Sequence, residues 1–172
     1  MCDQLSDFYK IGNFSVGQLL RETDNPTVEN CMMKAKIVPI EITCEILMEA
    51  VKKSNHEILL IDGFPRNMEN LQGFLSNKIV NQTIQIKSVL YLSCSEKTCT
   101  ERVLARGDRI GSLKRKDDNL QILKKRFESF EKETKKVISE FELRDVPVYK
   151  IDTELPKEQV FELIVGKNFL KS

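Results

Sequence analysis

The chain has 172 residues, of which 41% are hydrophobic and 31% charged, which is typical of a soluble globular protein with a sizeable core. Its 27 basic and 26 acidic residues leave a net charge of +1, which excludes a general attraction to nucleic acid or to a membrane surface. No apolar run approaches the roughly 20 residues of a membrane span. The five cysteines are scattered and form no CxxC pair, so we predict reduced thiols and a cytoplasmic protein, with the nucleus as a second compartment.

The first third of the chain is predicted to be mainly helical. In chain order the pattern predicts a short helix over 2–10, a short strand around Phe14, a helix over 16–22, a weakly helical segment over 28–36 and a helix over 39–54. Ser15 can cap the second of these helices. Pro39 can open the last one, because its fixed φ suits a first helical position.

The stretch 58–66, with the sequence ILLIDGFPR, carries the clearest chemical signal. Its four leading apolar residues predict a strand buried on both faces. Asp62 then lies at the carboxyl end of that strand, where open parallel sheets bind ligands. Gly63 allows the backbone to approach a ligand closely, and Pro65 stiffens the turn that presents Arg66. A carboxylate and a guanidinium at a sheet edge suit a metal-bound, phosphorylated ligand.

The remainder of the chain alternates strands with helices. The pattern predicts a helix over 67–76, a strand over 88–92, a helix over 94–106, a charged loop over 108–116, a long helix over 117–143, a strand over 147–151 and a helix over 158–170. Ser93 and Glu96 form a capping box, and the long helix carries an apolar stripe of Leu120, Leu123, Phe127, Phe130, Val137 and Phe141. This order predicts an α/β fold with a parallel sheet.

Six arginines fall near the ends of predicted elements or in loops that border one sheet edge: Arg21, Arg66, Arg102, Arg106, Arg115 and Arg126. Any one of them taken alone can be an ordinary surface residue. Arg102 and Arg106 are four residues apart on one helix face, where two cations repel unless an anion lies between them. The basic run 114–116 has no aromatic residues interleaved, which favours a solvated loop or a phosphate-binding lid over a nucleic-acid contact.

Several motifs together resemble the nucleoside monophosphate kinase (adenylate kinase) family, and within it the UMP/CMP kinases. The matching segments are 14–21 (FSVGQLLR), 36–43 (KIVPIEIT), 62–67 (DGFPRN) and 115–119 (RKDDN), of which DGFPRN is the most specific. The resemblance implies a P-loop-kinase-like parallel sheet flanked by helices, in one domain over 1–172. Residues 22–38 would be a trimmed monophosphate-binding part, and residues 107–117 a short lid.

The resemblance also implies a role for each matching residue. On the acceptor side, Arg21 and Arg66 would clamp the phosphate, Gly63 with Ile37 and Val38 would line the pocket for base and sugar, and Asn70 would read a pyrimidine base. On the donor side, Arg102 would lie beside the ATP base, Asp62 would hold Mg²⁺ through water, and Arg106, Arg115 and Arg126 would surround the transferring phosphoryl group. The implied reaction is ATP-dependent phosphorylation of CMP or UMP in pyrimidine biosynthesis, by a monomer.

One part of the family pattern is not found. The sequence has seven glycines, and no GxxxxGK[ST] occurs among them. In the family this phosphate loop follows the central strand, which lies between the strands that correspond to 58–62 and 88–92. We therefore expect no continuous ladder between those two segments. Three hypotheses stay open: an active kinase, a nucleotide-binding protein without catalysis, and a piece of a longer protein, which the mass of the native protein would reveal.

Overall fold

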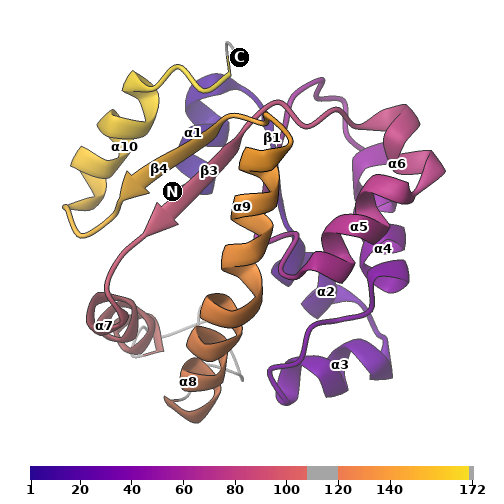
Figure 1. Ribbon diagram of the computed structural model, residues 1–172, viewed down its shortest axis with the longest axis horizontal. Helices are drawn as coiled ribbons and strands as arrows, with labels where there is room; N and C mark the ends of the chain where they lie inside the picture. Colours follow the sequence, from indigo (N-terminus) through magenta and orange to yellow (C-terminus); the bar gives the residue numbers. More distant parts are fainter. Residues whose placement is uncertain (108–119, 171–172) are drawn as a thin grey trace. The chain divides into compact units, whose positions relative to one another are not determined.

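The computed structural model describes residues 1–107 and 120–170 (Figure 1). The chain divides into two compact units, Met1–Gln85 and Ile86–Ser172. Each unit contains one pair of parallel strands flanked by helices, which confirms the predicted α/β class. The prediction of a single domain over 1–172, with its trimmed part and its lid, is not tested by this division and stays a prediction.

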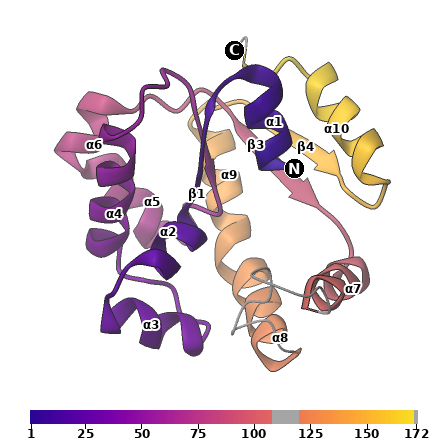
Figure 2. The ribbon, with the colours of Figure 1, turned by 180° about the vertical axis from the view of Figure 1, so that it is seen from behind.

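The first unit surrounds a two-stranded parallel sheet with helices. Its elements are α1 (Cys2–Tyr9), β1 (Gly12–Ser15), α2 (Val16–Glu22), α3 (Pro26–Met33), α4 (Ile40–Lys52), β2 (Leu59–Asp62), α5 (Met68–Ser76) and α6 (Lys78–Thr83). Strands β1 and β2 run in register from Gly12 opposite Leu59 to Ser15 opposite Asp62. Helix α1 contacts both strands, and α4 packs between α2 and α5 (Figure 2). The core side chains Leu5, Val28, Leu47, Leu71 and Val80 are at most 1% exposed.

Helices α4 and α5 approach each other closely at Gly73. A Cβ placed on Gly73 would lie 2.6 Å from Cγ1 of Ile40, so only glycine fits this contact. Ile40 is the first residue of α4 and is itself 7% exposed. The contact therefore fixes the segment that leads into α4 against the middle of α5.

The second unit has the same plan in a different order. Its elements are β3 (Val89–Ser93), α7 (Glu96–Gly107), α8 (Leu120–Ser129), the π-helix η1 (Phe130–Thr134), α9 (Lys135–Leu143), β4 (Val148–Asp152) and α10 (Lys157–Gly166). Strands β3 and β4 pair in parallel from Val89 opposite Val148 to Ser93 opposite Asp152. Helices α9 and α10 both contact β4, and the core includes Val137, Phe141, Ile151 and Ile164, all at most 4% exposed.

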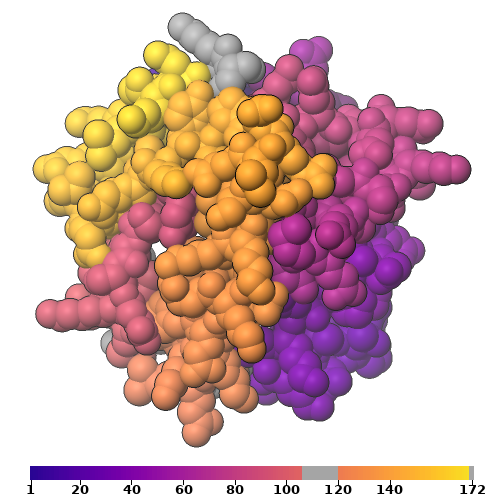
Figure 3. Space-filling model, viewed as in Figure 1, coloured from indigo at the N-terminus to yellow at the C-terminus, as the bar shows by residue number. Residues whose placement is uncertain are grey.

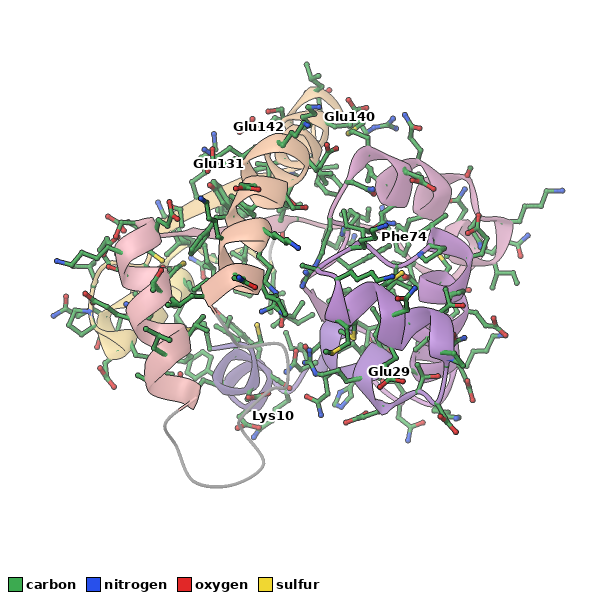
Figure 4. All side chains as sticks on the ribbon, turned by 90° about the horizontal axis from the view of Figure 1, so that it is seen from below. Lys10, Glu29, Phe74, Glu131, Glu140 and Glu142 are labelled. Carbon is green, nitrogen blue, oxygen red and sulfur yellow. The ribbon has the colours of Figure 1, made fainter. Side chains whose placement is uncertain are left out.

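The long helix predicted over 117–143 runs through α8, η1 and α9 from Leu120, where its description begins, to Leu143 (Figure 1). Its residues form the orange band of the space-filling view (Figure 3). Its outward carboxylates Glu131, Glu140 and Glu142 pair with Lys135, Arg144 and Lys150 at 2.7–2.8 Å (Figure 4). The predicted apolar stripe is wrong at one end, because Leu120 is 60% exposed and Ile122 is buried instead. Both residues lie in α8, before the π-helical turn, and Val137 and Phe141 beyond that turn are buried as predicted.

The strands of the described residues form two separate sheets, β1 with β2 and β3 with β4. The expectation that 58–62 and 88–92 share no continuous ladder is therefore confirmed. The prediction that the strand at 58–62 is buried on both faces is wrong, because β2 is half-buried and Asp62 is exposed; β3 is likewise mostly half-buried, with Leu92 exposed. Each described ladder has only two strands, so every strand has one edge outside a ladder.

Three local predictions also need correction. Helix α7 is capped by Ser95, whose Oγ accepts from the backbone N–H of Thr98 at 3.2 Å, and not by Ser93. The hydroxyl of Ser93 instead donates to the carbonyl of Ile151. Ser15 precedes α2 as predicted but makes no side-chain cap bond. The short helix α6 was not predicted, although its cap, Asn77, is a residue type that commonly begins helices.

Candidate functional site

All the residues predicted for the acceptor side lie in the first unit: Arg21, Ile37, Val38, Gly63, Arg66 and Asn70, together with Asp62. Ser15 and Asp62 end β1 and β2 opposite each other. Helix α2, which carries Arg21, and the loop 63–67, which carries Arg66, therefore begin at the same edge of the sheet. This is the carboxyl edge, where parallel sheets bind ligands.

The loop 63–67 has a defined conformation that presents Arg66. Gly63 has φ +77°, a region that favours glycine. Its carbonyl accepts a hydrogen bond from Nε of Arg66 at 2.9 Å. After Gly63, the Phe64–Pro65 peptide is cis, and the Phe64 ring packs edge-on against Phe74 of α5 with the centroids 5.2 Å apart. Figure 4 labels Phe74. The loop is thus anchored to α5 while the Arg66 side chain stays exposed.

Arg21 lies in the last turn of α2 and is also exposed. Its guanidinium lies over Gly17, one turn earlier, because a Cβ on Gly17 would be 3.7 Å from Nη1 of Arg21. Helix α2 packs on α3, on α4 and on both strands of the unit. The contacts of α2 therefore hold this second guanidinium in place.

Asn70 differs from the two arginines because it is only 3% exposed. Its backbone N–H donates to Oδ1 of Asn67, the cap of α5, at 2.8 Å. Its side-chain amide has no hydrogen-bond partner among the residues that the structure describes. Val38, which is 5% exposed, lies two residues before Ile40, the residue of α4 that contacts Gly73 of α5. Asn70 lies in α5, so the 37–38 segment leads into a helix that contacts the helix of Asn70.

Asp62 is exposed at the end of β2, and its charge affects the pKa of Cys2, the first residue of α1. Burial raises the pKa of the Cys2 thiol to about 11, and the negative charge of Asp62 adds to this rise. Sequence reasoning did not connect Cys2 with this edge. The described residues contain no cluster of three or more His, Cys, Asp or Glu side chains that could hold a metal. One carboxylate nevertheless fits Mg²⁺ held mainly by nucleotide phosphates and water, which is the usual arrangement for that ion.

The residues predicted for the donor side belong to the second unit. Arg102 is exposed on α7, and its Nη2 donates to the carbonyl of Leu155 at 3.5 Å. Arg106 lies in the same helix, and Arg126 is half-buried in the last turn of α8, just before the π-helical turn. Arg115 and most of the predicted lid lie outside the described residues. None of the helices in the described part of the chain combines the length and apolar character needed to cross a bilayer.

Glu154 connects the loop after β4 to the start of α7, a link that sequence reasoning missed. Its carboxylate accepts hydrogen bonds from the backbone N–H of Ser95 and, at 2.5 Å, from the hydroxyl of Thr98. These hydrogen bonds hold the pKa of Glu154 below its usual value. Only the long-range fold brings residues 95 and 154 together, so the sequence held no local signal for this contact.

Comparison with known proteins identifies the family. Residues 1–146 match the family described as "Adenylate kinase". The chain belongs to the adenylate kinase family. It is 36% identical to the UMP-CMP kinase of Homo sapiens over 176 residues, which cover 95% of this chain and 87% of the relative. It is 34% identical to the UMP-CMP kinase of Danio rerio over 182 residues, which cover 99% of this chain and 89% of the relative.

Membership confirms the resemblance inferred from the sequence motifs. The chain is a member of a nucleoside monophosphate kinase family, whose enzymes use ATP with Mg²⁺. Similarity over the whole chain does not assign a role to any single residue. The roles of the arginines, Asn70 and Asp62 stay predictions.

Proposed function

We propose that this protein binds CMP or UMP in its first unit and transfers the γ-phosphoryl group of ATP to it. The observation that supports the choice of acceptor is the position of Asn70, which is 3% exposed and whose side-chain amide makes no hydrogen bond among the described residues. In the described part of the chain the buried side-chain atom without a partner is Oδ1 of Asn13, so the Asn70 amide still reaches solvent, where a ligand can meet it. A ligand with a planar, hydrogen-bonding edge suits this position.

The chemistry of an amide explains why both pyrimidines fit. Asparagine offers one acceptor oxygen and two donor hydrogens. Cytosine presents a ring-nitrogen acceptor beside an amino donor, whereas uracil presents an imino donor beside a carbonyl acceptor. Rotation of the amide by half a turn exchanges its donor and acceptor, so Asn70 can pair with either base. Two of the relatives are named UMP-CMP kinase, which agrees with this dual acceptance.

The two exposed guanidiniums suit the phosphate of the acceptor. Arg21 and Arg66 come from segments that begin at one sheet edge, and each can bind a phosphate through two parallel hydrogen bonds. The first holds its position through α2, and the second through the Gly63 carbonyl. In this proposal they neutralise and orient the attacking phosphate oxygen.

The transfer step needs little covalent chemistry from the protein. A phosphate oxygen of CMP or UMP forms a bond to the γ-phosphorus of ATP, the bond from that phosphorus to the bridging oxygen breaks, and ADP leaves. Arg106, Arg115 and Arg126 would stabilise the charge on the transferring group, and Arg102 would lie beside the ATP base. Mg²⁺, when bound near Asp62, would supply further charge neutralisation.

The test is product formation by the full 172-residue chain. The chain is incubated with ATP, Mg²⁺ and CMP, UMP or AMP, and the products are separated by chromatography. We expect CDP and UDP to form, AMP to be a poor acceptor, and Arg66→Ala to lower the rate by at least about tenfold. Absence of any nucleoside diphosphate from CMP or UMP would contradict the transfer step.

A second candidate function is binding of the pyrimidine monophosphate without transfer. It is favoured by the sequence observation that no GxxxxGK[ST] occurs, since that loop cradles ATP phosphates in kinases of this kind. Without such a loop the rate should fall by several orders of magnitude. Saturable CMP binding with no CDP formed would select this function. The monomeric state, the cytoplasmic location and the absence of a nucleic-acid partner stay predictions made from the sequence.

A further inference from the structure

The second unit brings two thiols into contact at the junction of β3 and α7. Sγ of Cys94 lies 3.1 Å from Sγ of Cys99, and both residues are free and half-buried. Cys94 belongs to the short connection after Ser93, and Cys99 lies in the first turns of α7. A disulfide bond needs about 2.05 Å between the sulfurs, so a shift of about 1 Å would close the gap.

The backbone on both sides of the pair is fixed by hydrogen bonds. The N–H of Cys99 donates to the carbonyl of Ser95 at 3.0 Å. The carboxylate of Glu154 binds Ser95 and Thr98, the residues adjacent to the two cysteines. Ser93, which precedes Cys94, accepts from both the N–H and the hydroxyl of Thr153, at 2.7 and 3.0 Å. The thiols are therefore held together by the fold and do not meet only because they are near in sequence.

We propose that Cys94 and Cys99 form a reversible intramolecular disulfide when the protein meets a small-molecule disulfide such as glutathione disulfide. This modification site is independent of the proposed nucleotide chemistry. It differs from the other three cysteines because Cys2, Cys31 and Cys44 all belong to the first unit, where no thiol pair is in contact among the described residues.

The reaction proceeds by two exchanges. The Cys94 thiolate attacks one sulfur of glutathione disulfide, forms a mixed disulfide and releases one glutathione thiolate. The Cys99 thiol then loses its proton to solvent, and its sulfur attacks Sγ of Cys94 and releases the second glutathione thiolate. The protein dithiol is oxidised by two electrons, glutathione disulfide is reduced to two glutathione molecules, and the two thiol protons end on those molecules.

Cys99 is placed to make the second attack and not the first. Burial, the hydrogen bond to Cys94, and the charges of Cys94 and Glu154 raise the pKa of the Cys99 thiol to about 11, while Arg102 acts in the opposite direction. Cys99 thus stays protonated near neutral pH and is a slow primary nucleophile. Proximity to Cys94 compensates, because the attacked sulfur is already in contact with it.

The sequence provides a direct readout, because Lys97 lies between the two cysteines. The folded full chain is equilibrated with a glutathione and glutathione disulfide buffer, its free thiols are alkylated, and it is denatured and cut with trypsin. We expect peptide 88–97 to stay linked to peptide 98–102, with a mass two hydrogen atoms below their sum. The unmodified chain suffices for this measurement, so it does not depend on the folding of any variant.

The denatured chain distinguishes a folded pair from mere closeness in sequence. In guanidinium chloride the same cysteines are joined by a flexible segment, for which effective concentrations are in the millimolar range. We expect the folded chain to show an effective concentration at least about tenfold higher. Cys31→Ser, a half-buried cysteine of the first unit, should leave the link unchanged, whereas Cys99→Ser should stop at the mixed disulfide. An absent link, or one equally favoured in the denatured chain, would overturn the proposal.

Discussion

Arg66 and Asn70 are prepared for a ligand in opposite ways. Arg66 is exposed, and its guanidinium lies over Gly63, because Nε donates to the Gly63 carbonyl and a Cβ on Gly63 would be 3.3 Å from Nη2. Asn70 is buried, and its amide is left without a partner among the described residues. One residue contributes charge and the other selectivity, and their substitutions should therefore have different signatures.

Arg66→Ala should weaken CMP binding without unfolding the protein. A charge-assisted hydrogen bond contributes about 2 kcal/mol, which corresponds to about a 30-fold rise in Kd. Isothermal titration calorimetry measures this change. Arg144→Ala is the matched control, because Arg144 is a surface arginine of the second unit that pairs with Glu140. A Kd for Arg66→Ala within twofold of the wild-type value would remove Arg66 from the proposed clamp.

Asn70→Leu should separate binding from stability. Leucine has a similar volume, so it keeps the packing of this position, and the free energy of unfolding should stay close to that of the wild type. Binding of CMP should weaken by about tenfold, since the base loses a hydrogen-bonding partner. Urea unfolding and calorimetry report the two quantities. A destabilised variant that binds CMP normally would indicate a structural role only.

At the level of elements, the contact between α4 and α5 depends on Gly73. Gly73→Ala forces a Cβ to within 2.6 Å of Ile40, and such overpacking destabilises by about 1–3 kcal/mol. Gly166→Ala, at the end of α10, meets nothing within 4 Å and should instead stabilise by up to about 1 kcal/mol. Chemical denaturation compares the two. Equal effects of both substitutions would show that the close approach does not matter.

The link from Glu154 to the start of α7 should make the stability of the second unit depend on pH. Its hydrogen bonds lower the pKa of Glu154 from the usual 4.5, so the folded state favours the charged form. The stabilisation is therefore present above about pH 4.5 and is lost as the pH falls through the lowered folded-state value. We expect the difference in unfolding free energy between wild type and Glu154→Gln to shrink between pH 7 and pH 3. A difference that does not change over this range would contradict the link.

The sequence predicted the order and type of most elements because their signals are local. The apolar run before Asp62 and the helix pattern after Pro39 each lie within one element or at its end. Local signals failed where the fold acts over distance. Leu120 fits the apolar period of α8 and is nevertheless exposed, and the link from Glu154 to Ser95 joins residues far apart in sequence.

The candidate site was predicted to a similar extent. The DGFPRN motif identified the Gly63–Arg66 loop, and the structure adds the hydrogen bond that orients Arg66. Burial of Asn70 could not be read from the sequence, because it depends on how α5 packs in the folded unit. The contact between Cys94 and Cys99 was missed for the same kind of reason, since their spacing matches no metal or redox motif.

For the molecule as a whole, the two compact units separate the residues predicted to bind the acceptor from the arginines predicted to bind the donor. Every predicted acceptor residue lies in Met1–Gln85, and every predicted arginine of the donor side lies in Ile86–Ser172. Binding of the acceptor can therefore be measured without any requirement for transfer. Acceptor binding therefore tests the predicted residues of the first unit, whereas phosphoryl transfer also requires ATP.

The most direct test of the account is a calorimetric titration of the 172-residue chain with CMP and with AMP, in the absence of ATP. The account predicts saturable binding of one CMP per chain, at least about tenfold tighter than AMP, because a site built around a hydrogen-bonding amide rejects the wrong base edge. Absence of saturable CMP binding, or AMP binding as tight as CMP binding, would contradict the assignment of Arg21, Arg66 and Asn70 to a pyrimidine monophosphate site.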